Sequence, residues 1–307
     1  MCRVVAYVGR PINLETLLFE TDSSLVEQVC RPQMTTSINL AGFGMVAWDD
    51  NSERPEEPFV YRTTTLPMYD RNLHNLARKI RPRCLVAHIR GANFSQESVV
   101  AEQNVHPFRF PGVHVALAHN GHLRGFSRMR PGLAEHLRPD VATSMVATID
   151  SEWIYAIVLS QLDDPWGEPQ ADELVEAIAK TLRIIRQVRR EQGIDTSSPV
   201  NLFATTGRCL VATRFSFDYG WYPPGDPFFE MDLPYVSLWY TLGGEYVHKG
   251  DTWEMVGDGN RDAQAFLIAS EPLTHNTSRW LEVPEYSVVS ATARNGTIET
   301  TSRELDA

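Results

Sequence analysis

The stretch Met1-Cys2-Arg3-Val4-Val5-Ala6-Tyr7-Val8 joins a thiol to a strand-forming run. Residues 4–8 are apolar and rich in β-branched side chains, which predicts a strand directly after Cys2. If Met1 is removed, Cys2 carries a thiol and an α-amine, whose ordinary pKa values are about 8.5 and about 8. One residue could then attack a carbonyl carbon and supply the base for that attack. The dipeptide alone favours the alternative, a cysteine with no catalytic role.

The composition describes a globular chain with an acidic balance. The chain has 307 residues, of which 43% are hydrophobic and 22% are charged, and its formal net charge is −11. A length of this order suits one large domain or two ordinary ones. The acidic balance argues against nucleic acid and anionic membranes as partners, because both require a basic face.

No targeting, membrane-spanning or metal-binding pattern is evident. The first residues lack a basic region followed by an apolar run, so we expect no signal peptide, and no stretch of eighteen apolar residues predicts a membrane span. Four cysteines lie far apart without C-x-x-C spacing, which predicts neither a disulfide framework nor a zinc site. We therefore expect a cytoplasmic protein with a free Cys2 thiol, no metal and no cofactor.

Strand-like and helical segments alternate without a phosphate-binding glycine loop, which indicates an α+β domain of stacked layers. Thr206-Gly207-Arg208 has the character of a hairpin turn. Strands are predicted at residues 4–8, 43–48, 84–89, 114–119, 202–204, 209–213, 237–241, 266–269 and 286–290. Helices are predicted at residues 14–19, 25–29, 151–162, with Asp150 as its cap, and 170–192.

The segment 170–192 gives the clearest helical pattern. Its apolar face is formed by Leu174, Ile178, Leu182 and Ile185. Its arginines are expected to form a solvated face, namely Arg183, Arg186, Arg189 and Arg190. Residues 48–58 are acidic and contain proline, which predicts an exposed loop. Residues 218–234 are rich in proline and aromatic residues and form either a lid or binding loop or a packed surface loop.

Polar residues follow several predicted strands. His119-Asn120-Gly121 could place an amide N–H and a backbone N–H around an oxyanion, although Asn-Gly is also a common turn and the turn is favoured. Arg90 could bind a carboxylate through its planar fork or form a surface salt bridge. Asp150 could hold an amine or cap a helix, and both roles are compatible. His88 and His119 are more often packing residues than catalysts.

The order of these motifs resembles that of class II glutamine amidotransferases. Cys2 comes first, and the remaining motifs follow in the same order: Gly42-Phe43-Gly44, His88-Ile89-Arg90-Gly91-Ala92, Asn104 to Phe108, His119-Asn120-Gly121 and Asp150-Ser151-Glu152. This family belongs to the N-terminal nucleophile (Ntn) hydrolases. The resemblance implies an α+β fold of four layers in αββα order, formed by residues 1–307 as a single domain.

Motifs in the second half are similar to those of stand-alone γ-glutamyl hydrolases of the ergothioneine-biosynthesis and glutathione-degradation type. They are Asn201 to Gly207, Val211 to Arg214, Ser237 to Tyr240, Ala269 to Thr274, Trp280 and Val283-Pro284. Because no synthase domain is evident, the chain is expected either to hydrolyse its substrate outright or to pass ammonia to a separate chain.

The resemblance also implies a role for each matching residue. Cys2 would be the nucleophile, and Asn120 and Gly121 would form the oxyanion hole. Arg90 would hold the α-carboxylate of a γ-glutamyl group and Asp150 its α-ammonium. His88 and His119 are carried over with the substrate-binding motifs.

Two positions depart from the family pattern. Ala41 stands where the family often has an aspartate, so a charged hydrogen bond is lost from that loop. Arg3 replaces the glycine common after the nucleophile in larger amidotransferases, although the ergothioneine-type enzymes tolerate arginine there.

The expected reaction is hydrolysis of the γ-glutamyl amide bond of glutamine or a larger compound through a γ-glutamyl thioester. A glutaminase subunit serving a separate synthase is the first alternative. A non-catalytic scaffold or binding protein that retained the fold is the second.

Overall fold

Strand β1 (Arg3–Gly9), which directly follows Cys2, lies inside a large antiparallel sheet of the computed structural model. The structure describes residues 2–35, 38–91, 100–222, 236–259 and 262–307. The first sheet has seven strands in the order β13-β9-β12-β1-β4-β2-β3. The bounds of the other six are β2 (Phe43–Trp48), β3 (Phe59–Thr63), β4 (Cys84–Ile89), β9 (Trp239–Gly243), β12 (Ala265–Ala269) and β13 (Leu281–Glu282).

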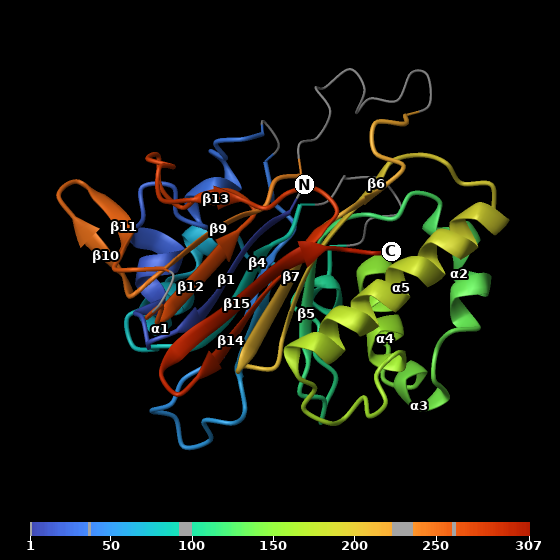
Figure 1. The fold of residues 1–307 in the computed structure, drawn as a ribbon, viewed down its shortest axis with the longest axis horizontal. Coiled ribbons are helices and arrows are strands. Elements are labelled where there is room, and N and C mark those ends of the chain that lie inside the picture. Colours follow the sequence, from blue (N-terminus) through green and yellow to red (C-terminus); the bar gives the residue numbers. More distant parts are fainter. Residues whose placement is uncertain (1, 36–37, 92–99, 223–235, 260–261) are drawn as a thin grey trace.

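A second antiparallel sheet faces the first (Figure 1). Its strands follow the order β15-β14-β7-β6-β5, and β8 pairs with β6 off this path. Their bounds are β5 (Ala116–Gly121), β6 (Ser198–Thr205), β7 (Cys209–Arg214), β8 (Ser216–Phe217), β14 (Ser287–Arg294) and β15 (Thr297–Glu304). A separate hairpin of β10 (Glu245–Lys249) and β11 (Thr252–Val256) lies at the opposite end from the long helices.

The alternation of side chains along β1 explains its continuous apolar run. Val4, Ala6 and Val8 belong to the core between the two sheets. Val5 and Tyr7 belong to the core on the other face of the first sheet. Successive side chains of a strand point to opposite faces, so a strand that is covered on both faces must be apolar throughout.

Helices cover the outer face of each sheet, which completes the four layers. The second sheet is covered by α2 (Phe126–Ala134), α3 (Pro139–Ala142), α4 (Asp150–Ser160) and α5 (Ala171–Glu191). The outer core of the first sheet includes residues of the short helices η1 (Thr16–Glu20), η2 (Glu27–Val29) and α1 (Arg71–Ala77). Two further single turns are η3 (Pro67–Tyr69) and η4 (Glu102–Asn104). The predicted αββα architecture is confirmed, with one helical layer thinner than the other.

Helix α5 confirms the strongest sequence pattern and corrects one part of it. Gln170 and Glu173 form a capping box, in which the Gln170 N–H donates to Glu173 Oε2 at 2.7 Å. The predicted apolar face is buried, and each such leucine or isoleucine contributes about 1.5–3 kcal/mol. The prediction that Arg189 is solvated is wrong, because its side chain is only 1% exposed. It pairs with Asp218 at 2.8 Å and lies over the ring of Phe217.

Two predictions about the ends of elements are also corrected. Asn120 and Gly121 do not form a turn, since they lie in β5 opposite Asn201 and Val200 of β6. Asp150 is the first residue of α4 rather than its N-cap, which is Ile149. The side chain of Asn120 donates to Ser270, and the carboxylate of Asp150 accepts from the N–H of Leu123. Each side chain therefore bonds to a residue far away in sequence and not within a local turn or cap.

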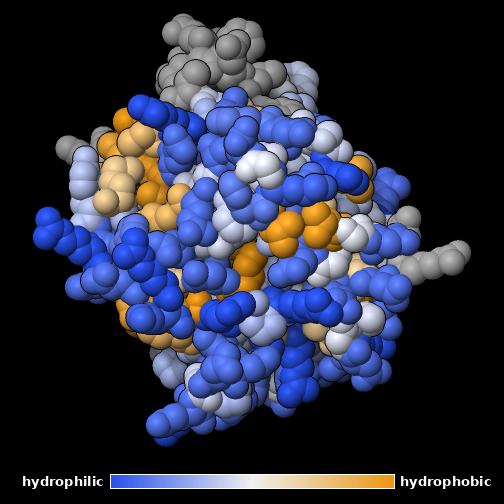
Figure 2. All heavy atoms as spheres, turned by 90° about the vertical axis from the view of Figure 1, so that its left-hand side faces the viewer, coloured by the Kyte–Doolittle hydropathy of each residue, from blue (hydrophilic) through white to orange (hydrophobic). Residues whose placement is uncertain are grey.

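The surface includes one long exposed loop and a mostly hydrophilic face. Residues 49–58 form the predicted exposed loop, whereas Trp48 is buried at the end of β2. The segment 223–234 of the other proposed loop lies outside the described residues. The face that carries the β10–β11 hairpin is mostly hydrophilic, with its hydrophobic residues gathered in a narrow band and a small cluster (Figure 2). Within the described ranges, no helix has the length and apolar character needed to cross a bilayer.

Candidate active site

The register of β1 against β4 brings Cys2 to one end of the first sheet. Arg3 lies opposite Ile89. Because the two strands are antiparallel, Cys2, which precedes β1, and the residues that follow β4 lie together at the same end of the sheet. A cleft of about 630 Å³ opens there. Its wall contains Cys2, Arg90, Gly121 and Asp150, which are spread over almost half of the chain.

The Cys2 thiol is held against the backbone of Gly91. Its Sγ lies 3.4 Å from the Gly91 nitrogen, which donates to it, and 3.6 Å from the Gly91 oxygen. The side chain is 6% exposed and yet lines the cleft. A small ligand in the cleft can therefore reach the sulfur, while the residue itself has little freedom to move.

A buried ion pair lies directly beneath Cys2. Arg3 donates from Nη1 to the Cys2 carbonyl oxygen at 2.9 Å, and its Nε lies 3.8 Å from Glu271 Oε2. The Glu271 carboxylate also accepts hydrogen bonds from the backbone N–H groups of Gln33 and Met34. Burial lowers the pKa of Arg3, and the charges of Glu271 and Cys2 act in the opposite direction. This pair fixes the backbone that carries the thiol.

Arg90 and Asp150 place a cation and an anion in the same cleft. Arg90 is 4% exposed; burial lowers its pKa, and the negative charges of Cys2 and Asp150 partly compensate. The Asp150 carboxylate accepts from the Leu123 N–H at 2.6 Å and from the Ser151 hydroxyl at 3.2 Å. The Asp150 carboxylate is thus held in place, and the cleft offers the two opposite charges that the recognition of a zwitterion requires.

Asn120 is linked to β1 by one hydroxyl group. Its Nδ2 donates to Ser270 Oγ at 3.1 Å, and the same oxygen accepts from the Val4 N–H at 3.0 Å. Gly121 lines the cleft, whereas Asn120 lies behind the lining residues. Ser270 belongs to a motif noted in the sequence, but no pattern there indicated this contact.

Gly121 is required by the close approach of β6. A Cβ at this position would lie 1.8 Å from the Pro199 carbonyl oxygen, and the backbone has a φ of +154°. Only glycine fits at this point, which leaves its backbone open to a ligand.

Three buried histidines form a cluster beside the cleft. The rings of His88 and His106 are 4.1 Å apart, and His119 accepts or donates through Nδ1 to Ser151 Oγ at 2.9 Å. Burial lowers the pKa of His88 to about 3 and lowers the pKa values of His106 and His119. All three are therefore neutral near pH 7. Of this cluster, only His106, which sequence reasoning did not single out, lines the cleft; His88 and His119 lie behind it.

The sequence also gave no role to several further lining residues. His122, Arg124, Phe126 and Arg130 follow β5 or lie in the first turns of α2. Burial lowers the pKa of His122 to about 4. In the part of the chain that the structure describes, no group of three or more His, Cys, Asp or Glu residues is placed to hold a metal ion.

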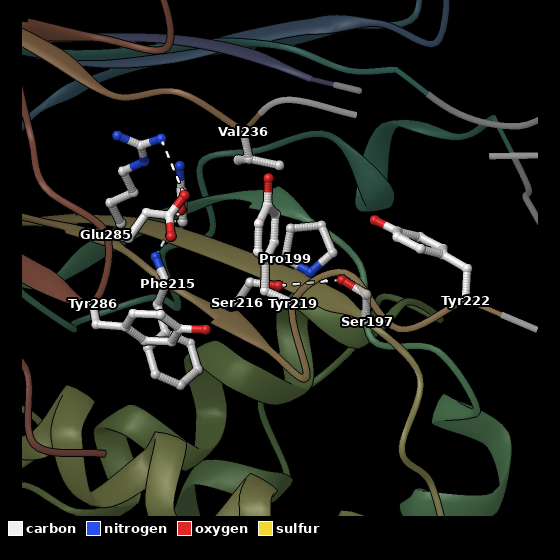
Figure 3. A pocket seen from close by; sticks show the side chains of 11 residues that line it. Ser197, Pro199, Phe215, Ser216, Tyr219, Tyr222, Val236, Glu285 and Tyr286 are labelled. Atoms are coloured by element: carbon white, nitrogen blue, oxygen red, sulfur yellow. Dashed lines mark hydrogen bonds and ion pairs between the residues drawn. The ribbon is translucent and has the colours of Figure 1, made fainter. Parts of the chain in front are cut away.

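A second recess, whose side chains Figure 3 shows, is too small for a substrate. Pro199, Tyr219, Tyr222 and Tyr286 are among its lining residues, and it encloses only about 20 Å³. Such a volume holds little more than one water molecule. The larger cleft at Cys2 is therefore the candidate active site.

Comparison with known proteins assigns the family. Residues 32–217 match the family of class-II glutamine amidotransferases. This match covers more than half of the chain, and the chain belongs to that family of Ntn-type enzymes. The probable glutamine amidotransferase DUG3 of Saccharomyces cerevisiae is 25% identical over 94% of this chain and 81% of its own length.

Two solved structures share the fold. A class-II glutamine aminotransferase domain protein of Silicibacter pomeroyi is 20% identical, with a TM-score of 0.61 and full coverage of both chains. The glutamine phosphoribosylpyrophosphate amidotransferase of B. subtilis is 15% identical, with a TM-score of 0.53. That match covers 98% of this chain and 49% of the other. At these identities the likeness supports the architecture and leaves the substrate open.

Proposed function

We propose that Cys2, as the first residue of the processed chain, hydrolyses the γ-amide bond of glutamine or of a larger γ-glutamyl compound. The observation that carries this proposal is the meeting of Cys2, Arg90, Gly121 and Asp150 in one cleft. The family match begins at residue 32, so it does not itself include Cys2.

The charges of the cleft match a γ-glutamyl group. Arg90 binds the α-carboxylate and Asp150 binds the α-ammonium, which fixes the γ-carbonyl carbon near the Cys2 sulfur. The backbone of Gly121 stabilises the oxyanion that forms when the sulfur attacks. Asn120 adds the second N–H of its side-chain amide from behind the cleft lining, while the first donates to Ser270. No cofactor takes part in this scheme.

The proton balance follows from the α-amine of Cys2. This amine accepts the thiol proton as the C–S bond forms, and it returns the proton to the leaving nitrogen as the C–N bond breaks. Ammonia or an amine departs and a γ-glutamyl thioester remains. Water then attacks the thioester, which releases glutamate and restores the thiol.

The cysteines provide a direct test. With a panel of γ-glutamyl amides that includes glutamine and glutathione, Cys2→Ala is expected to lower kcat at least about 10⁴-fold. Cys30 is the only exposed cysteine among the described residues, and Cys30→Ala serves as the matched control with an unchanged rate. Equal rates for wild type and Cys2→Ala on every substrate would refute the proposal.

The fate of Met1 tests the role of the α-amine. Met1 lies outside the described residues, and the scheme requires its removal because a peptide bond would block the amine. Mass spectrometry of the active enzyme should show a chain that starts at Cys2. A fully active species that keeps Met1 contradicts the α-amine mechanism.

The same panel separates hydrolysis from ammonia delivery. A glutaminase subunit would show weak glutaminase activity alone and a higher activity with a separate synthase chain. A stand-alone hydrolase needs no second chain.

A further inference from the structure

A short irregular segment forms part of the cleft wall and leads into α4. We call residues 146–149 the α4 approach. Its Thr148 and Ile149 line the cleft, and Asp150 follows as the first residue of the helix. Irregular backbone has no regular ladder of hydrogen bonds, so its N–H groups need other partners. The partners of the α4 approach therefore decide how firmly the residue next to it, Asp150, is held.

Two buried side chains bind three successive N–H groups of the α4 approach. Glu152 accepts from the Val146 N–H at 3.0 Å through Oε1 and from the Ala147 N–H at 2.8 Å through Oε2. Asn104 Oδ1 accepts from the Thr148 N–H at 3.1 Å. Glu152 is 1% exposed and Asn104 is fully buried. Hydrogen bonds to an ionised acceptor are the stronger kind, so Glu152 is the firmer of the two anchors.

Glu152 acts on the backbone and not on a ligand. It is not among the described residues that line the cleft. It follows Asp150 by two positions in α4, and residues at that spacing do not share a face of a helix. Part of its charge is offset by Arg62, because burial lowers the pKa of Arg62 and the charge of Glu152 raises it.

The contacts of Glu152 close a loop that contains Asp150. Glu152 lies in the first turn of α4 and bonds back to residues that precede the helix, so Asp150 lies between the two ends of this link. The Asp150 carboxylate itself accepts from the Leu123 N–H and the Ser151 hydroxyl. A displacement of about 1 Å at a binding group is enough to weaken the recognition of a substrate strongly. The loop therefore controls where the Asp150 carboxylate meets a ligand.

We propose that Glu152 is a positioning residue that fixes Asp150 and thereby sets the selectivity of the cleft for an α-ammonium group. This inference rests on the proposed function, in which Asp150 binds that ammonium. It assigns the selectivity to a residue that does not touch the substrate.

A pair of substrates that differ only at the α-carbon tests this role. The pair consists of the γ-glutamyl amide that reacts fastest in the panel and its glutaryl analogue, in which hydrogen replaces the α-ammonium; for glutamine the analogue is glutaramic acid. Hydrogen bonds to a charged group contribute about 1.5–3 kcal/mol, so kcat/KM should favour the γ-glutamyl compound about 10- to 100-fold in the wild-type protein.

Glu152→Gln should bring this ratio toward one. The amide can accept from only one of the two N–H groups and places its own NH₂ group against the other. We expect the loss to come mainly from a higher KM for the γ-glutamyl compound, while the constants for the glutaryl analogue stay close to those of the wild type. A role in stability alone would lower the rates of both substrates equally.

Glu271 provides the matched control. Its carboxylate is also 1% exposed and also accepts from two successive backbone N–H groups, those of Gln33 and Met34, but it supports the side of the cleft that carries Cys2. Glu271→Gln should lower the rates of both substrates and keep the wild-type ratio. Because the ratio is taken within each variant, partial loss of folded protein cancels from it.

Three further variants make the test independent of any one substitution. Glu152→Asp keeps the charge but shortens the reach, and Asn104→Ala removes the other anchor of the α4 approach, so both should lower the ratio. Asp150→Asn should reduce it to about one. Addition of Glu152→Gln to Asp150→Asn should then change the ratio no further, because the two residues act as one unit.

The outcomes separate this inference from the proposed function. A wild-type ratio in Glu152→Gln overturns the positioning role. So does a ratio that survives in Glu152→Asp and is lost in Glu152→Gln, since the charge of Glu152 would then matter and not its geometry. If the wild-type protein requires Cys2 but does not distinguish the two substrates, the inference fails and the hydrolase remains. If Cys2→Ala keeps full activity, the proposed function itself fails.

Discussion

The hydroxyl of Ser270 bridges Asn120 and the backbone of Val4, with distances of 3.1 Å to Asn120 Nδ2 and 3.0 Å to the Val4 nitrogen. One oxygen therefore links the side chain proposed for the oxyanion hole to the strand that carries the nucleophile. These groups are 150 and 266 residues from Ser270 in sequence.

Removal of this hydroxyl should reduce catalysis more than binding. In Ser270→Ala, two buried donors lose their acceptor, and we expect a loss of about 1–3 kcal/mol in the free energy of unfolding. We also expect kcat to fall about tenfold with little change in KM, because Asn120 is no longer fixed where the oxyanion forms. Steady-state kinetics and urea unfolding measure the two effects.

Ser290 supplies the control for this variant. It is also buried and its hydroxyl pairs with Thr301, between β14 and β15 of the second sheet. Ser290→Ala should affect stability alone. A comparable loss of kcat in both variants would show that Ser270 has only a structural role.

Gly121→Ala should be poorly tolerated. The new Cβ would lie 1.8 Å from the Pro199 carbonyl oxygen, and neither backbone segment can rotate away from the other. We expect a loss of about 3 kcal/mol or more in the free energy of unfolding. Gly193→Ala has a φ of +60° and open space around the Cβ, so it should cost only about 1–2 kcal/mol. Thermal unfolding compares the two, and equal losses would contradict the steric argument.

Breaking the Arg3–Glu271 pair should destabilise the fold strongly. Both side chains are at most 3% exposed, so Glu271→Ala leaves a buried guanidinium without its counter-ion. A loss of about 3–5 kcal/mol is expected by urea unfolding. Glu27, which pairs with Arg31 on the surface, provides the control, and Glu27→Ala should change stability by less than about 0.5 kcal/mol. A similar small effect for Glu271→Ala would show that the pair contributes little.

The buried histidines should make stability fall in weakly acidic solution. Burial lowers the pKa of His88 to about 3 in the folded state, whereas an unfolded histidine has a pKa of about 6.5. Below about pH 6.5 the unfolded chain binds a proton that the folded chain excludes. The free energy of unfolding therefore decreases as the pH falls from about 6.5 toward 3, by up to about 1.4 kcal/mol per pH unit for this residue.

Urea unfolding at pH 7, 6 and 5 measures this slope. His106 and His119 shift in the same direction and should add to it. His88→Gln should reduce the slope, while replacement of the exposed His248 should leave it unchanged. An identical slope in wild type and His88→Gln would contradict the assignment.

Regular elements with strong patterns could be predicted from the sequence. Residues 43–48 and 84–89 were predicted within the bounds of β2 and β4, because their apolar runs are buried on both faces. The polar strands β3, β10, β11 and β15 were not predicted, since their pairing depends on neighbours and not on an apolar pattern.

The individual site residues could be predicted only from the order in which the family's motifs occur along the chain. Each of Arg90, Asn120 and Asp150 had an ordinary local explanation. In the structure, local explanations fail for two of them: Asn120 lies within β5, and Asp150 receives a hydrogen bond from Leu123 in place of capping α4. Arg124, which precedes α2, and Arg130, which lies in it, carried no signal, because nothing in the sequence indicates that this segment meets a cleft.

By itself, the sequence determined that Cys2 precedes a strand, that strands and helices form stacked layers, and that the family's motifs occur in order. The first two features follow from hydrophobic periodicity, which is a local property, and the third can be read directly along the chain. Only the tertiary structure decided that Cys2 meets Gly91, that Ser270 joins Asn120 to β1, and that Arg189 is buried. These contacts join residues from separate elements, and strand register and layer packing set their distances.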